Sequence, residues 1–140
     1  MKFDIPKNCH IRWQAALAVL QDLQEDIKTP FDMGKWSDRK TQWEGYCGTA
    51  ACFGGYITIA PYCRALGSPT VGQQVKQWLL GVNEDTINIG LWKLDDELFD
   101  FEINAGSRAK TLAFLEKKLK SIFKESTGKR LIAPLTFYVD

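Results

Sequence analysis

The stretch from residue 47 to residue 66, CGTAACFGGYITIAPYCRAL, decides the fold because Arg64 is its only charged residue. A helix that is apolar on most of its sides is normally surrounded by other elements. We therefore expect a buried central helix over about residues 48–66, with Thr49 as its N-cap. Pro61 removes one backbone donor and clashes with the preceding turn, so the helix either kinks there or breaks before Pro61 and restarts.

Amphipathic helices are predicted on both sides of this stretch, because apolar residues recur there at spacings of three and four; in the first helix they are Trp13, Leu17, Leu20, Leu23 and Ile27. Polar N-caps and glycine or proline stops place these helices at about residues 8–30, 68–81, 83–92 and 107–128. The N-caps would be Asn8, Ser68, Asn83 and Ser107. Residues 2–5 and the tail 130–140 are the only strand-like segments, and they would pair with each other or with a second copy. The fold class is thus mainly α, a single domain over residues 1–140 with about five helices.

Composition points to an ordinary globular protein. The 140 residues are 45% hydrophobic and 25% charged, which suits one domain with its own core. No apolar run approaches the roughly 20 residues that span a bilayer, and no export signal is visible. We therefore expect a cytoplasmic protein whose four cysteines, Cys9, Cys47, Cys52 and Cys63, are reduced. A net charge of +1 argues against binding driven by overall charge.

The cysteine-glycine segment has a structural and a functional interpretation. Gly48 permits a tight entry into the helix. Four small residues leave little side-chain bulk, so another backbone could approach closely; they are Ala50, Ala51, Gly54 and Gly55. Cys52 would then be a small buried hydrophobe. Alternatively, Cys47 at a helix N-terminus would have a lowered pKa and act as a nucleophile. A nucleophilic cysteine needs a base, however, and nothing in the sequence brings the single histidine, His10, to Cys47.

A zinc site is not predicted, because the C-x4-C and C-x10-C spacings differ from the closely paired ligands of structural zinc sites. No cofactor motif occurs either.

The cysteine-glycine segment does resemble small uncharacterised proteins of bacteria and their phages that carry an FDM…W…C-G-T-x-x-C-x-x-G pattern. The matching residues are Phe31-Asp32-Met33, Trp36, the run from Cys47 to Gly55, Leu80-Gly81-Val82 and Leu98-Phe99. The resemblance implies a shared fold and brings no activity with it. The chain departs from these proteins in the apolar helix, which contains Gly55 and Pro61, and in its strand-like ends.

Three surfaces are candidates for function. Aromatic residues of the loop before Cys47 either anchor that loop or form a recognition surface; they are Phe31, Trp36, Trp43 and Tyr46. Residues 84–102 are acidic, and residues 108–130 are basic. Lys117, Lys120 and Lys124 could contact phosphates of a nucleic acid, or simply keep the helix soluble.

Complementary charged faces favour protein contacts or self-association. Our leading hypothesis is a protein-binding module of phage or bacterial origin that blocks or modulates a host protein. The alternatives are a thiol- or metal-dependent enzyme centred on Cys47 and a nucleic-acid-binding protein.

Overall fold

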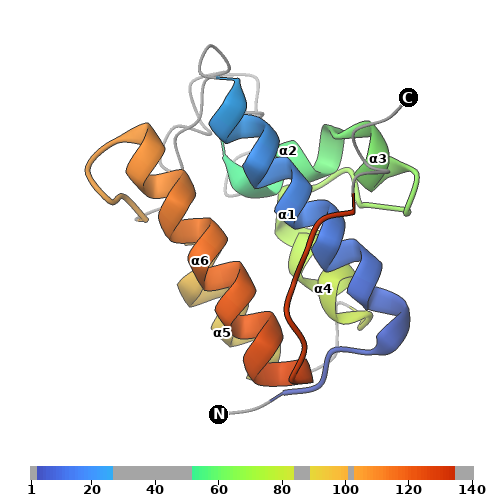
Figure 1. Cartoon of the computed structure of the whole chain (residues 1–140). Helices are drawn as coiled ribbons and strands as arrows, with labels where there is room; N and C mark the ends of the chain where they lie inside the picture. The colour runs from blue at the N-terminus through green and yellow to red at the C-terminus, as the bar shows by residue number, and fades with distance from the viewer. Residues whose placement is uncertain (1–2, 27–51, 84–88, 101–102, 135–140) are drawn as a thin grey trace.

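Six α-helices and two short 3-10 helices form the part of the chain that the computed structural model describes, residues 3–26, 52–83, 89–100 and 103–134 (Figure 1). The elements are η1 (Lys7–Cys9), α1 (His10–Glu25), α2 (Phe53–Ile59), α3 (Pro61–Arg64), η2 (Gly72–Gln74), α4 (Val75–Leu80), α5 (Ile89–Glu97) and α6 (Arg108–Thr127). The mainly helical fold is therefore confirmed. Residues 3–6 and 131–134 form no strand, so the predicted terminal strands are absent from the described parts of both ends.

The first helix, α1, lies at the centre of the molecule and contacts α2, α3, α4 and α6. The described residues of its predicted apolar side, Trp13, Leu17, Leu20 and Leu23, are buried, and Ile27 lies outside the described residues. Four further residues of α1 are also buried: Ala15, Ala16, Ala18 and Val19. The Trp13 indole donates a hydrogen bond to the Leu79 carbonyl at 2.8 Å, which ties α1 to α4. Asn8 is not the N-cap, because a 3-10 turn precedes the helix and Cys9 occupies the cap position without a side-chain bond.

The predicted central helix is buried as expected but consists of two helices, the second of the two outcomes predicted for Pro61. Residues 53–58 of α2 are all buried. Ala60 is extended, with ψ at 128°, and Pro61 begins α3. The N-cap of α2 is Cys52, whose sulfur accepts a hydrogen bond from the Gly55 amide at 3.3 Å. The prediction that Thr49 caps this helix is therefore wrong.

The close backbone approach predicted for the glycines is present at Gly54. A Cβ added to this residue would lie 3.4 Å from the Gly72 carbonyl oxygen and 3.7 Å from the ring of Phe99. The 3-10 turn η2 therefore packs directly on α2, and Phe99 stacks on Phe53 with ring centroids 5.4 Å apart.

Three further predicted helix boundaries need correction. α1 ends at Glu25, with Asp26 as its C-cap, instead of continuing to Pro30. Ser68 begins no helix, because regular structure restarts at η2; its side chain is buried, and its hydroxyl has no hydrogen-bond partner among the described residues. The helix predicted to end at about Trp92 continues to Glu97 as α5. The predicted ends at Gly81 and Gly128 are confirmed, since both glycines are left-handed C-caps.

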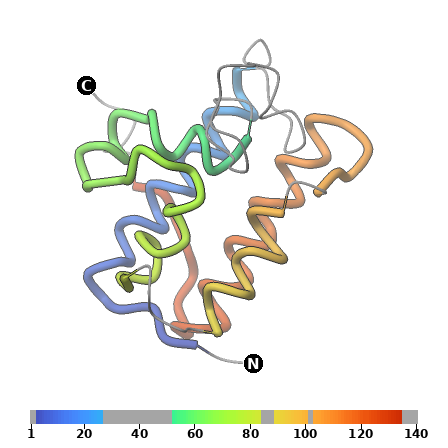
Figure 2. Tube along the Cα trace, turned by 180° about the vertical axis from the view of Figure 1, so that it is seen from behind, coloured from blue at the N-terminus to red at the C-terminus, as the bar shows by residue number. Residues whose placement is uncertain are grey.

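The last helix, α6, matches its prediction. The Ser107 hydroxyl accepts from the Lys110 amide at 3.2 Å, and the predicted apolar side is buried. In Figure 2 α5 overlaps α6 in projection, and the ion pair between Glu97 of α5 and Lys118 of α6 at 3.1 Å joins the two helices. Residues 129–134 then lie between α6 and α1 in Figure 1, where Leu131 is buried and the Ile132 carbonyl accepts a hydrogen bond from Gln14 at 3.0 Å. A single core thereby joins both ends of the described chain.

Candidate functional site

Several residues that the sequence singled out lie outside the described residues. They are the loop aromatics Phe31, Trp36, Trp43 and Tyr46, and the motif residues Cys47, Gly48 and Thr49. Apart from the corrected cap role of Thr49, their proposed roles in recognition, reactivity and helix entry therefore stay predictions. The candidate site below consists of described residues.

The expectation of fully reduced thiols is wrong for Cys52, which is disulfide-bonded and buried. Cys9 and Cys63 are free. Disulfides persist in oxidising compartments and are rare in a reducing cytosol. The bond at Cys52 therefore weighs against the predicted reducing environment.

The free thiols are poorly suited to nucleophilic chemistry. Burial, reinforced by the nearby Asp22 carboxylate, raises the pKa of Cys63 to about 12. Burial also raises the pKa of Cys9, against a smaller opposing effect of Arg12. The His10 ring contacts neither free thiol as a base: its Nε2 lies 3.1 Å from the Ile5 carbonyl oxygen, and the ring packs edge-on against Phe123. Neither thiol is available as thiolate near neutral pH.

A metal centre finds no support in the described part of the chain, where no group of three His, Cys, Asp or Glu side chains is arranged to hold an ion.

Ion pairs at the surface use some of the charges of the acidic stretch, and one of these pairs joins it to the basic stretch. Glu97 of α5 pairs with Lys93 at 2.7 Å and with Lys118 of α6 at 3.1 Å, while Lys76 of α4 pairs with Asp95 at 2.6 Å. Partial burial opposes ionisation of Glu97, but hydrogen bonds from the two lysines outweigh it and hold its pKa below the ordinary value. The complementary charges that the sequence suggested for a partner are thus used in part to join α4, α5 and α6.

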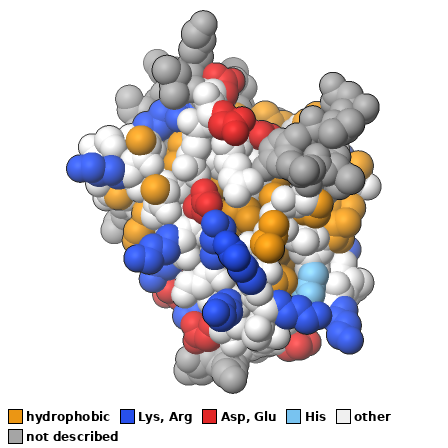
Figure 3. Space-filling view, in the orientation of Figure 1, with side chains coloured by type: hydrophobic (Ala, Val, Ile, Leu, Met, Phe, Trp, Pro, Cys, Tyr) orange, Lys and Arg blue, Asp and Glu red, His pale blue; other side chains and the backbone are white. Residues whose placement is uncertain are grey.

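The polar side of α6 remains basic where it faces solvent (Figure 3). Lys120 pairs with Glu116 at 2.7 Å. Lys117 and Lys124 are exposed and make no ion pair within the described residues. These lysines do not form a continuous unpaired row, so phosphate binding by α6 stays a prediction.

A surface hollow that the sequence did not predict lies between the C-terminal half of α1 and the junction of α2 with α3. Its volume is about 260 Å³. The lining residues are Val19, Asp22, Leu23 and Asp26 from α1 and its C-cap, and Tyr56, Ile59, Ala60, Pro61 and Tyr62 from the other wall. The hollow forms because the chain turns at Ala60 instead of continuing as a helix. Pro61 was the one sequence signal that could have pointed to it.

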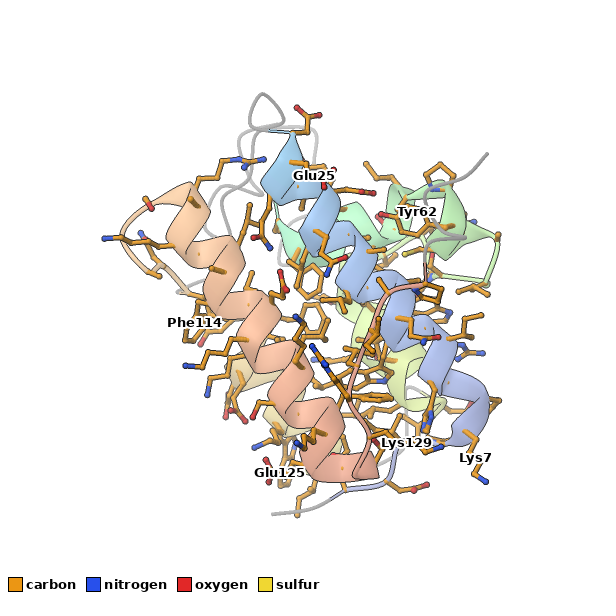
Figure 4. The ribbon with its side chains drawn as sticks, in the orientation of Figure 1. Lys7, Glu25, Tyr62, Phe114, Glu125 and Lys129 are labelled. Atoms are coloured by element: carbon orange, nitrogen blue, oxygen red, sulfur yellow. The ribbon has the colours of Figure 1, made fainter. Side chains whose placement is uncertain are left out.

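Both walls of the hollow are held in place. The Tyr62 hydroxyl donates to the Asp22 carboxylate at 2.6 Å and so ties α3 to α1 (Figure 4). The Thr58 hydroxyl donates to the Gly55 carbonyl at 2.5 Å within α2. At the rim, the side chain of Ile59 is 56% exposed although most other apolar residues of α2 are buried. The arrangement is an open apolar depression with fixed walls and carboxylates at one end.

Comparison with protein-family models, curated proteins and solved structures finds no match to this chain. Within the described residues, none of the helices combines the length and the apolar character needed to cross a membrane.

Proposed function

We propose that the chain is a protein-binding module that seats part of its partner in the hollow between α1 and the α2–α3 junction. The observation that carries the proposal is the combination of an apolar depression with a large aliphatic side chain, Ile59, left exposed at its rim. Single exposed apolar residues are common, but an apolar concavity beside one is typical of a recognition site.

The size of the hollow favours a protein partner over a small molecule. Pockets for drug-sized ligands usually enclose roughly 300–1,000 Å³. The hollow, at about 260 Å³, lies below that range. It is larger than the roughly 150 Å³ cavity that accepts benzene, so it can take one large side chain. Interfaces commonly place such an anchor residue in a pocket of the partner.

The resemblance to small bacterial and phage proteins makes a bacterial host protein the first class of partner to test, with blocking or modulation of that protein as the effect. A cytoplasmic location is part of the proposal, although the disulfide at Cys52 is more typical of oxidising compartments. The aromatic loop predicted from the sequence is proposed as a second contact surface for the same partner.

The proposal is tested by site-specific photo-crosslinking. A benzophenone amino acid is placed at position 59 or, as a matched control, at position 132, because the side chains of Ile59 and Ile132 are equally exposed at 56%. After irradiation in a bacterial lysate, a discrete adduct with another protein is expected from position 59 and not from position 132. Adducts from neither position, or the same adducts from both, would contradict the proposal.

A further inference from the structure

The disulfide at Cys52 lies at the start of the helix that carries one wall of the hollow. The Cys52 side chain is buried, and its sulfur accepts the hydrogen bond from the Gly55 amide that caps α2. Tyr56 and Ile59, about one and two turns further along α2, line the hollow. The same sulfur atom therefore takes part in a covalent bond and in the cap of this wall.

The partner of Cys52 within the chain follows by elimination. The sequence contains four cysteines, and Cys9 and Cys63 are free. Cys47 is therefore the one cysteine left to close the bond at Cys52. The bond would close a ring over residues 47–52, immediately before α2 begins.

The α2 wall depends on support from outside the helix, because α2 has little stability of its own. It has seven residues, two of which are Gly54 and Gly55. Helices shorter than about 12–15 residues are marginal in isolation, and glycine lowers helix propensity further. The helix is not continued at its far end, since Ala60 is extended and Pro61 begins α3. Packing and the anchored N-terminus therefore hold the wall in place.

The proposed cytoplasmic location indicates what kind of disulfide this would be. Disulfides that form in a reducing cytosol are usually transient, and they are catalytic or redox-sensing. Because the Cys52 sulfur caps α2, opening of the bond acts first on that helix and on the wall it carries. This arrangement suits redox sensing.

We propose that the Cys52 disulfide, closed with Cys47, is a redox switch that holds the α2 wall of the hollow in its binding conformation. This inference rests on the proposed function and adds its regulation. With the bond open, the first turn of α2 loses its covalent anchor, and the wall is ordered in only a fraction of the molecules. The apparent affinity of the hollow for its partner falls by that fraction.

The switch uses thiol–disulfide exchange with a small thiol such as glutathione. A glutathione thiolate attacks the sulfur of Cys47, because the Cys52 sulfur is buried in the folded chain. The S–S bond breaks, a mixed disulfide forms, and Cys52 leaves as a thiolate that accepts from the Gly55 amide and then takes up a proton. A second glutathione thiolate releases Cys47 as its thiol and gives oxidised glutathione. Oxidised glutathione reverses the reaction.

Mass spectrometry of the full-length chain tests the bond and its reversibility. The folded chain is held in reducing and then in oxidising glutathione buffer, quenched with acid, unfolded and alkylated with iodoacetamide. We expect four alkyl groups after reduction and two after oxidation, with the difference confined to the chymotryptic peptide 47–53. Equal numbers under both conditions, a difference in another peptide, or a disulfide-linked dimer would overturn the inference.

Methyl NMR of the two forms tests whether the bond acts on the wall. The signals of Ile57 and Ile59 in α2 should shift or broaden on reduction, whereas those of Leu115 and Leu119 in α6 should not. Unchanged α2 signals, or equal changes in α6, would overturn the inference, because the bond would then act nowhere near the hollow or on the whole domain alike.

Binding is followed by photo-crosslinking from position 59 in a bacterial lysate freed of small thiols. Cys47→Ala opens the bond without a reductant, so the partner's own cysteines stay unchanged. Its adduct yield should be lower than that of the oxidised wild type by about threefold to fortyfold, the upper value being the entropy of a six-residue loop expressed as a ratio. The reduced wild type should show the same loss. Cys9→Ala, at a cysteine outside the bond, should keep the full yield.

The outcomes separate this inference from the proposed function. A loss smaller than about threefold for Cys47→Ala, or an equal loss for Cys9→Ala, would overturn the switch and leave the proposed function standing. No discrete adduct from position 59 in either redox state would overturn both.

Discussion

The substitution Gly81→Ala tests how η1 and α4 are joined. Gly81 ends α4 in the left-handed region, with φ at +66°. A Cβ added there would lie 2.8 Å from the sulfur of Cys9, the last residue of η1. Nonbonded carbon atoms are best separated by about 3.5–4.0 Å, so the sulfur or the backbone would have to move. The joint between the N-terminal turn and α4 therefore depends on the absence of a side chain at this position.

Two costs add in this variant. An alanine in the left-handed conformation costs about 1–2 kcal/mol, and overpacking a buried contact costs about 1–3 kcal/mol. Gly128→Ala is the matched control, because Gly128 is also a left-handed C-cap, with φ at +76°, and a Cβ there would meet nothing within 4 Å. We expect the free energy of unfolding to fall by about 2–5 kcal/mol for Gly81→Ala and by about 1–2 kcal/mol for Gly128→Ala.

The assay is urea unfolding followed by tryptophan fluorescence, with the free energy taken from linear extrapolation. Cys9→Ala supplies the third corner of a double-mutant cycle, because it removes the sulfur that the new Cβ would meet. In that background, Gly81→Ala should cost about 1–3 kcal/mol less than in the wild type. Equal losses for Gly81→Ala and Gly128→Ala, or a coupling energy below about 0.5 kcal/mol, would refute the reasoning.

Three further predictions concern other parts of the core. Ser68→Ala should leave the free energy of unfolding unchanged or raise it by about 1 kcal/mol, because it removes a buried hydroxyl that has no partner among the described residues; a clear loss in urea unfolding would contradict this. Gly54→Val should lower the same quantity by about 1–3 kcal/mol, and more than Gly54→Ala, since a branched side chain would press on the Gly72 carbonyl. The pKa of Glu97 lies below its ordinary value of 4.5, so the unfolded chain protonates this carboxylate more readily than the folded chain does. The stabilisation that ionised Glu97 gives to the fold is therefore complete above about pH 4.5 and is lost as the pH falls through the folded-state pKa. Urea unfolding between pH 6 and pH 3 should therefore show a shallower decline for Glu97→Gln than for the wild type, and identical slopes would contradict the role of this carboxylate.

Local sequence signals predicted the long helices well. The spacing of Trp13, Leu17 and Leu20 identified the buried side of α1, and Ser107 and Gly128 marked both ends of α6. These signals act within a few residues of the chain, so a single sequence contains them. The predictions that were wrong or missing depend instead on contacts between separate parts of the chain.

Ser68 has the sequence of an N-cap, yet it is buried, its amide donates to the Cys63 carbonyl and its carbonyl accepts from Arg64, so packing against α3 overrides the local preference. The hollow could not be predicted either. It depends on which side of α1 meets the turn at Ala60, and that relation joins residues about 40 positions apart, as the hydrogen bond from Tyr62 to Asp22 illustrates. Pro61 indicated a break in the helix but not what would face it.

The buried thiol of Cys63 has a kinetic consequence. In the folded protein its high pKa and its burial suppress reaction with alkylating or disulfide reagents. Modification must therefore wait for α3 to detach, after which the thiol regains an ordinary pKa of about 8.5. The rate of modification then measures how often this wall of the hollow opens. Any molecule that binds across Tyr62 and Asp22 must slow that rate, whatever its chemical identity.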